Sequence, residues 1–243
     1  KHTNQAISMS ISRNDKYLYL NPRLCGKILI AKLARLIVSS GGEPMAFSNY
    51  LRFGNPNNPE HYWQFKEVVL GLGEMSRAIN TPVVNSNVNF KLLDEDNGNQ
   101  SELMSIIGMV GLLENHIQST TLDFKDEGDF IISIGSLNGV LGGSEYLETI
   151  HDKVQGPICP LDIETEMRVQ DVCIDAIKAG IIKSAHDLSI GGLTVNIAES
   201  IMKSGNSYLG AKLNLSRKLR NDELLFGECQ SVIIVTISEE HLI

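Results

Sequence analysis

Apolar and polar residues follow patterns along the chain that predict strands and helices in alternation. Residues 16–20 are rich in Tyr and Leu, which predicts a short strand. A helix is predicted from Gly26 until near Gly41, because glycine commonly ends a helix. The chain is then predicted to return as a strand at residues 44–51.

The clearest helical pattern begins at Pro59, because proline suits the first position of a helix. Its apolar residues recur at helical spacing and predict one buried face. This face consists of Tyr62, Phe65, Val69, Leu72 and Ile79. Residues 81–90 and 104–113 are predicted to be strands, and the polar stretch 93–102 between them a loop.

A second set of elements follows a polar stretch that lacks clear periodicity. A strand is predicted at residues 130–135, a glycine-rich turn from Gly135 to Gly143 and a helix from about Ser144. Asp162 suits the N-cap of a further helix that ends at Gly180. The apolar stripe of that helix is predicted to be Ile163, Met167, Ile174 and Ile177. The last predicted elements are a strand at residues 182–185, a helix at 193–202 and a strand at 231–237.

These elements predict two domains. The polar stretch places a boundary at about residue 120, so residues 1–120 form the first domain and residues 121–243 the second. Strands and helices alternate in both, so the expected fold class is α+β or mixed α/β, built in layers.

Charge and hydropathy exclude two classes of partner. The 243 residues carry a formal charge of -8 and the basic residues are scattered, which argues against a nucleic-acid surface. The longest apolar stretch, residues 28–38, is broken by Lys32 and Arg35, so no membrane span is predicted. Because the chain begins with Lys1 rather than Met, we expect it to be a piece of a longer protein.

The four cysteines predict neither zinc binding nor a disulfide scaffold. Cys25, Cys159, Cys173 and Cys229 lie far apart and form no CxxC pair. Reduced thiols in a cytoplasmic protein fit this pattern best.

Two glycine-containing segments are candidates for chemistry. The turn from Gly135 to Gly143 joins a strand to a helix and suits phosphate binding by backbone amides, although a tight turn that needs positive φ is the simpler reading. In residues 184–192, Asp187 suits either Mg²⁺ or a helix cap. His186 favours a structural hydrogen bond over a role as a base, because no partner is identifiable.

Asparagines in predicted strands are a further sign of function. Three of them lie in residues 85–89, against their low β-propensity, and residues 49–56 join a strand to the long helix. The simpler alternative for residues 85–89 is a strand end with exposed asparagines. There is neither a P-loop nor a nucleophile constellation.

Taken together, several segments resemble one known family. They read, in order, YLYLNP, GGEPMAFSNYLRFGNPNNPEHYWQF, INTPVVNSNVNF, IGMVGLL, GGSEYL, SAHDLSIGGL and LFGECQS. They resemble the landmarks of formylglycinamide ribonucleotide amidotransferases, also called phosphoribosylformylglycinamidine synthases. The resemblance runs from about residue 16 to 235, and the FGNP-to-WQF run is its most specific part. The last two segments are shared with aminoimidazole ribonucleotide synthetase and selenophosphate synthetase.

The resemblance implies a fold and an activity. The fold is an aminoimidazole ribonucleotide synthetase-like half-barrel domain followed by an α/β/α-layered domain. The family converts formylglycinamide ribonucleotide, ATP and glutamine-derived ammonia to the amidine, ADP and phosphate, with Mg²⁺. It uses two tandem pairs of such domains, and this chain resembles the second pair, truncated at its C-terminus, without the catalytic histidine of the first.

The resemblance also implies site residues and partners. Asn49 and Ser86 stand at ATP-contacting positions, Asn87 at a metal position and Asn89 at a substrate-contacting position, while Asp187 is a second metal candidate. Expected partners are the missing first half of the same chain, a glutaminase subunit or domain and a phosphorylated substrate. A homodimer through the first domain is also possible.

The chain departs from the family pattern at several of these positions. The family usually has an acid at positions 49 and 190, asparagine at 52, glycine at 86 and serine at 89. This chain has Asn49, Ile190, Arg52, Ser86 and Asn89 there. Carboxylates are lost and a cation is gained, so the site is expected to hold Mg²⁺ poorly, while Arg52 suits a phosphate. Two alternatives to a ligase part therefore stay open: a non-catalytic assembly half, and another ATP-using enzyme of the superfamily.

Overall fold

The first part of the chain forms a four-stranded sheet. In this computed structural model, which describes residues 3–91, 103–205, 209–215 and 218–242, the strands lie in the order β1-β4-β2-β3. Their bounds are β1 Ala6–Arg13, β2 Glu43–Phe53, β3 Val83–Phe90 and β4 Met104–Leu113. Strand β4 is antiparallel to β1 and β2, whereas β2 and β3 are parallel. The predicted loop at 93–102 lies outside the described residues.

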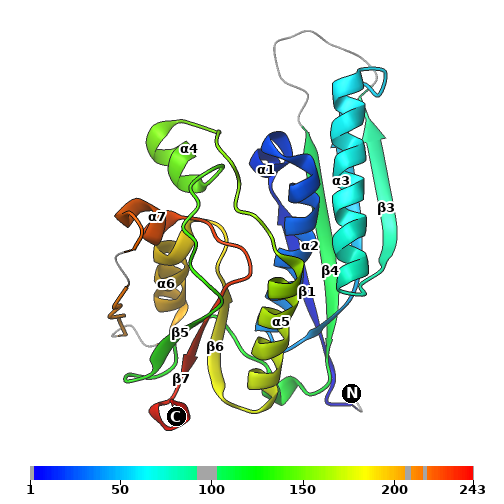
Figure 1. The fold of residues 1–243 in the computed structure, drawn as a ribbon. Coiled ribbons are helices and arrows are strands. Elements are labelled where there is room, and N and C mark those ends of the chain that lie inside the picture. The colour runs from blue at the N-terminus through cyan, green and yellow to red at the C-terminus, as the bar shows by residue number, and fades with distance from the viewer. Residues whose placement is uncertain (1–2, 92–102, 206–208, 216–217, 243) are drawn as a thin grey trace.

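Helices cover one face of this sheet, as Figure 1 shows. They are α1 Asp15–Leu20, α2 Pro22–Ser39 and α3 Pro59–Ala78. Helix α2 is buried along most of its length and forms the centre of the core with α3 and with Phe47, Leu51 and Phe53 of β2.

The strand predicted at residues 16–20 is wrong, because these residues form helix α1. The side chain of Asn14 accepts a hydrogen bond from the backbone N–H of Tyr17 at 2.9 Å and caps the helix. Asn21 then ends α1 and caps α2 in the same way, through the N–H of Leu24 at 3.1 Å. Two successive caps therefore outweigh the β-propensity of Tyr and Leu.

Strand β1, which was not predicted, turns its polar side chains toward the helices and its apolar side chains outward. Its serines face α2, where Ser8 Oγ lies 2.7 Å from Ser40 Oγ and Ser10 Oγ donates to the carbonyl of Leu33 at 3.2 Å. Its apolar residues point away from the helices and are exposed. They are Ile7, Met9 and Ile11. The sheet therefore has an uncovered apolar face.

The buried face of helix α3 overlaps the predicted one only in part. Its buried residues are Gln64, Val68, Gly71, Leu72 and Met75. Of the predicted face, Leu72 is buried, and Phe65 and Ile79 are partly buried against the same core. Tyr62 and Val69 are exposed. The cause is a close approach to α2, because a Cβ built on Gly71 would lie 2.0 Å from the carbonyl oxygen of Arg23.

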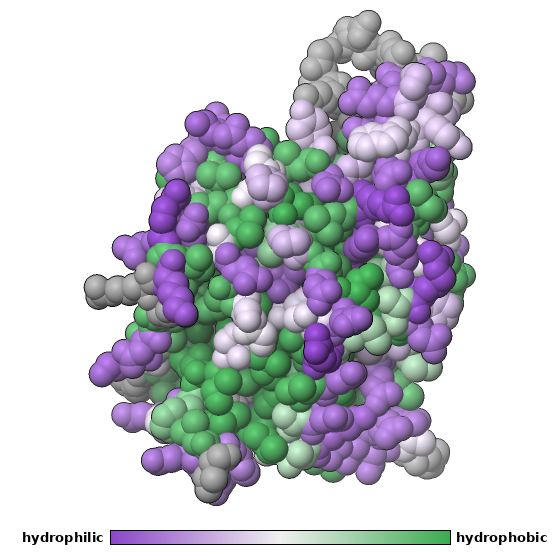
Figure 2. All heavy atoms as spheres, viewed as in Figure 1, coloured by the Kyte–Doolittle hydropathy of each residue, from purple (hydrophilic) through white to green (hydrophobic). Residues whose placement is uncertain are grey.

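The second part forms a three-stranded antiparallel sheet in the order β5-β7-β6. Its strands are β5 Phe130–Ile134, β6 Ile182–Asp187 and β7 Ile233–Ile237, and its helices are α4 Glu145–His151, α5 Ile163–Lys178, α6 Gly192–Lys203 and α7 Asn221–Phe226. Helix α5 packs on one face of β7 and α6 on the other. These α/β/α layers agree with the expected fold class. Apolar side chains gather on the viewed side over this sheet (Figure 2).

Asp162 caps α5 as predicted, and accepts the N–H of Thr165 at 2.9 Å. Three of the four residues of the predicted apolar stripe face the core: Ile177 is buried, and Ile163 and Ile174 are partly buried against it. Met167 is exposed. The fully buried residues of α5 are Glu166, Val169, Gln170, Cys173 and Ile177. Two polar residues take core positions because α5 packs against a buried arginine of α2.

The two parts of the chain pack against each other, and each contributes a residue to the core of the other. Val38 of α2 belongs to the core of the second sheet, and Ile158 belongs to the core of the first. All four cysteines are free and buried. In the described part of the chain, no helix has the length and apolar character needed to cross a membrane.

Candidate functional site

The residues predicted to contact ATP meet on neighbouring strands. Asn49 of β2 lies opposite Ser86 of β3, and Ser86 Oγ donates a hydrogen bond to Asn49 Oδ1 at 2.7 Å. The same face of β3 carries Phe90, whose ring packs against Phe65 of α3. Asn49 and Ser86 therefore lie on the side of the sheet that the helices cover, at a point where Ser86 stays exposed.

Asn87 and Asn89 lie on the opposite face of β3, because successive side chains of a strand alternate. Their neighbours on β2 are Tyr50 and Arg52, respectively. This is the uncovered face, and both asparagines are exposed. The predicted metal position thus lies beside Tyr50, and the predicted substrate position beside Arg52. Among the described residues, no group of three or more His, Cys, Asp or Glu side chains is placed to hold a metal.

Asp187 lies in the other sheet, at the end of β6, and the structure does not bring it to Asn87. Its Oδ1 accepts a hydrogen bond from Nε of Arg35 in α2. Arg35 also donates to Glu166 Oε2 of α5 at 2.7 Å and to Gln230 Oε1 at 3.1 Å. All three charged side chains are 0–1% exposed. We call Arg35, Glu166 and Asp187 the buried ion cluster.

The cluster is a net anion with one free oxygen. Burial acts to lower the pKa of Arg35, but Asp187 and Glu166 outweigh it, so the pKa is raised and the guanidinium stays charged. Within the described residues, Asp187 Oδ2 is buried without a hydrogen-bond partner. Lys32, one turn before Arg35, has its pKa lowered by burial, although Asp187 acts in the opposite sense. Arg35 therefore already occupies one oxygen of Asp187.

His186 has the hydrogen bonds that a structural role requires. Its Nδ1 lies 3.2 Å from the carbonyl oxygen of Asn196 and 3.2 Å from Ser200 Oγ, both in α6. Its Nε2 lies 3.3 Å from Glu199 Oε2. These contacts join the end of β6 to the helix that follows it.

The glycine-rich turn has the geometry of a tight turn that needs positive φ, which was the simpler of its two interpretations. Gly135, Gly139 and Gly143 all have positive φ, between 61° and 101°. The backbone N–H groups of Asn138 and Gly139 point at Cys229 Sγ, at 3.2 and 3.4 Å. Two amides that suit a phosphate are therefore already used within the protein.

Sequence reasoning missed Arg35, Glu166, Glu228 and Tyr17 as members of buried polar contacts. A signal existed for Arg35, because it interrupts the apolar run of α2 and a charge there needs a buried partner. Glu228 lies within the LFGECQS segment, but no sequence pattern identifies the distant partners of Glu228 and Glu166, which are Tyr17 and Arg35, respectively.

Comparison with known proteins identifies the class. The N-terminal domain model of AIR synthase related proteins matches residues 2–113, and the C-terminal domain model matches residues 126–242. The chain therefore belongs to the AIR synthase related protein family, as its motifs indicated. It is 42% identical to the phosphoribosylformylglycinamidine synthase subunit PurL of Alkaliphilus metalliredigens, over 99% of this chain and 32% of that protein. The chain spans about a third of the length of such curated relatives.

Solved structures share the fold. Thermotoga maritima PurL complexed with ATP matches with a TM-score of 0.73 and 16% identity, over 98% of this chain and 37% of that one. The same protein complexed with FGAR matches with a TM-score of 0.73 and 14% identity, over 98% and 38%. These matches confirm the expected fold class, an N-terminal domain of the AIR synthase related type followed by the C-terminal domain of that type, because both domain models and the overall fold agree.

Proposed function

We propose that this chain is part of an ATP-dependent carbon–nitrogen ligase that makes formylglycinamidine ribonucleotide in de novo purine biosynthesis. The reaction would use formylglycinamide ribonucleotide and glutamine-derived ammonia. The observation that carries the proposal is the 42% identity to a phosphoribosylformylglycinamidine synthase subunit along the whole chain. In this reaction ATP activates an amide oxygen by phosphorylation, and ammonia then attacks the activated carbon. Such catalysis rests on positioning and charge stabilisation.

The test of this proposal uses the intact parent protein. ADP release is measured with formylglycinamide ribonucleotide, Mg-ATP and ammonium, and again without the ribonucleotide. Release that depends on the ribonucleotide is expected. A folded parent protein that releases no ADP under these conditions would favour the non-catalytic assembly half, and release with a different acceptor would favour another member of the superfamily.

We also propose that the β2–β3 site contributes weakly to nucleotide binding. On the helix-covered face of the sheet, Asn49 and Ser86 would contact ATP. On the opposite face, Asn89 would contact the substrate and Asn87 would offer one neutral oxygen to Mg²⁺, so the two pairs do not line one pocket within this chain. Mg²⁺ prefers carboxylate and water ligands, whereas the neighbours of Asn87 and Asn89 on β2 are Tyr50 and Arg52. The described residues therefore fit the metal poorly, and the missing half would supply its main ligands.

Asp187 fits a metal less well than Asn87 does. Its Oδ2 is the one oxygen left for a cation, but Arg35 is bonded to the other oxygen. A divalent ion there would have to compete with the charge of Arg35. A role for Asp187 in metal binding stays a prediction, and its contacts favour a structural role.

Replacing Asn87 with alanine should weaken Mg-ADP binding to the intact parent protein about two- to tenfold, because it removes one neutral oxygen worth about 0.5–1.4 kcal/mol. Isothermal titration calorimetry measures the change. Asn85→Ala is the matched control, because Asn85 lies on the same face of β3 two residues away. Equal weakening in both variants would remove Asn87 from the proposed site.

The uncovered face of the first sheet is the proposed contact with the missing half of the protein. Ile7, Met9 and Ile11 are 73–77% exposed there, which is a large apolar row for a surface strand. A glutaminase subunit or domain is the second proposed partner, and the cytoplasm the proposed location. Without its other half, a second copy of the chain would cover this face.

The isolated chain should therefore form a dimer whose dissociation constant rises at least about tenfold in Met9→Lys, because a charge would replace a buried apolar side chain. Sedimentation equilibrium measures it. Met202→Lys is the control, because Met202 is as exposed but lies on α6. A monomeric chain, or an equal loss in both variants, would contradict this contact.

A further inference from the structure

Glu228 carries a buried carboxylate that accepts three hydrogen bonds. It lies between α7 and β7 and is 3% exposed. Its Oε2 accepts the hydroxyl of Tyr17 at 2.7 Å. Its Oε1 accepts the backbone N–H of Glu145 at 2.9 Å and that of Gly191 at 3.1 Å. One side chain thus satisfies two backbone donors and one hydroxyl.

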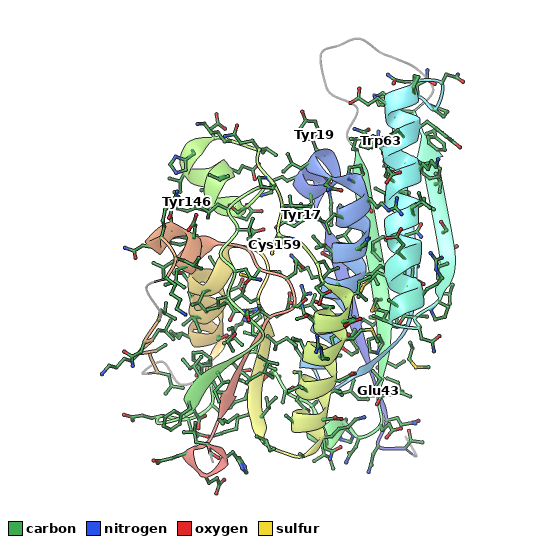
Figure 3. The ribbon with its side chains drawn as sticks, in the orientation of Figure 1. Tyr17, Tyr19, Glu43, Trp63, Tyr146 and Cys159 are labelled. Carbon is green, nitrogen blue, oxygen red and sulfur yellow. The ribbon has the colours of Figure 1, made fainter. Side chains whose placement is uncertain are left out.

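The three donors come from elements that are far apart in the sequence. Tyr17 belongs to α1 in the first part of the chain, Glu145 is the first residue of α4 and Gly191 is the N-cap of α6. Figure 3 shows Tyr17 lying inward, toward the second part, whereas Tyr19 of the same helix lies at the outer surface. Glu228 therefore connects the first part to the starts of two helices in the second.

The segment that carries Glu228 is itself held tightly on the glycine-rich turn. The backbone N–H of Glu228 donates to the carbonyl oxygen of Val140 at 2.9 Å. Gly227 lies so close to Gly139 that a Cβ on Gly227 would be 2.4 Å from the Gly139 Cα. The backbone of Glu228 therefore cannot shift without moving this turn.

We propose that Glu228 is a positioning residue that sets the placement of both glycine-containing turns, residues 135–143 and 188–192, relative to α1. Its charge strengthens all three hydrogen bonds. Tyr17 serves only as a donor, because burial and the nearby Glu228 raise its pKa. This role goes beyond the proposed ligase activity and does not depend on it.

The first experiment measures the effect of one domain on the other. Amide hydrogen exchange is followed by NMR in the 243-residue chain and in Tyr17→Phe, which removes only the hydroxyl. The N–H groups of Glu145 and Gly191 should exchange about tenfold faster, because the carboxylate loses its third anchor. Val169 in α5 should exchange at an unchanged rate, which excludes a global loss of stability.

Tyr19→Phe is the matched control, because it makes the same change on the same helix at a residue that is 61% exposed. It should leave both amides unchanged. If Tyr17→Phe also leaves both unchanged, Glu228 is a local helix cap and the proposed link between the two parts is overturned.

A second pair of variants tests the charge. Glu228→Ala should speed exchange at both amides about a hundredfold, and Glu228→Gln should fall between it and the unchanged protein, because an amide oxygen still accepts both N–H groups but more weakly. Equal exchange in Glu228→Ala and Glu228→Gln would overturn the role of the carboxylate. If Glu228→Ala does not fold, the comparison of Tyr17→Phe with Tyr19→Phe still decides whether Glu228 links the two parts of the chain.

Discussion

Replacing Arg35 with alanine should lower the free energy of unfolding by about 3–5 kcal/mol, because two buried carboxylates would lose their cation. Arg35 is fully buried and bonds to Glu166 and Asp187 at once. Urea unfolding followed by circular dichroism measures the change. The loss should appear as a lower midpoint, with the slope of the transition largely unchanged.

Two further variants separate the buried ion cluster from ordinary surface pairs. Arg23→Ala removes an arginine from an exposed pair with Glu74 and should change the stability little. Arg35→Met combined with Glu166→Gln and Asp187→Asn should be more stable than Arg35→Ala, because it leaves no unpaired charge. If Arg35→Ala costs no more than Arg23→Ala, the cluster does not contribute as proposed.

Replacing Gly71 with alanine should destabilise the protein by about 1–3 kcal/mol, although alanine is the better helix former. A Cβ there would lie 2.0 Å from the backbone carbonyl oxygen of Arg23, which cannot move without shifting α2. Thermal unfolding should show a lower midpoint.

Gly73→Ala is the opposing control on the same helix. The nearest atom to a Cβ at Gly73 is the Arg77 Nη1 at 3.2 Å, the end of a flexible side chain. The gain in helix propensity should then dominate and stabilise the protein by about 0.5–1 kcal/mol. Effects of the same sign in both variants would contradict the close contact of α2 with α3.

Local signals in the sequence predicted the elements that depend on local chemistry. Asp162 was identified as a cap because its partner, the Thr165 N–H, is only three residues away. Strand β4 was predicted with the bounds that the structure has, because it is a continuous apolar run. Strand β1 was missed although it alternates serine with apolar residues, which is a direct strand signal.

Positions whose burial depends on distant partners were not predicted. The buried faces of α3 and α5 were predicted from apolar periodicity alone, yet Gly71 is buried because it contacts Arg23 and Glu166 because it pairs with Arg35. Neither partner can be identified from helical spacing. The same limit applies to the site, where the register that sets Asn49 beside Ser86 arises from strand pairing across 37 residues.

The pairing of β1 also has a consequence for the time course of folding. Ala6 lies opposite Leu113, so β1 has to wait for about a hundred further residues before its partner strand exists. At a synthesis rate of about 5–20 residues per second, that interval lasts roughly 5–20 s. During it, the backbone groups of β1 have no partner strand, and such an unpaired strand is a template for pairing with another chain. Strand β1 is therefore open to aggregation until β4 has been made.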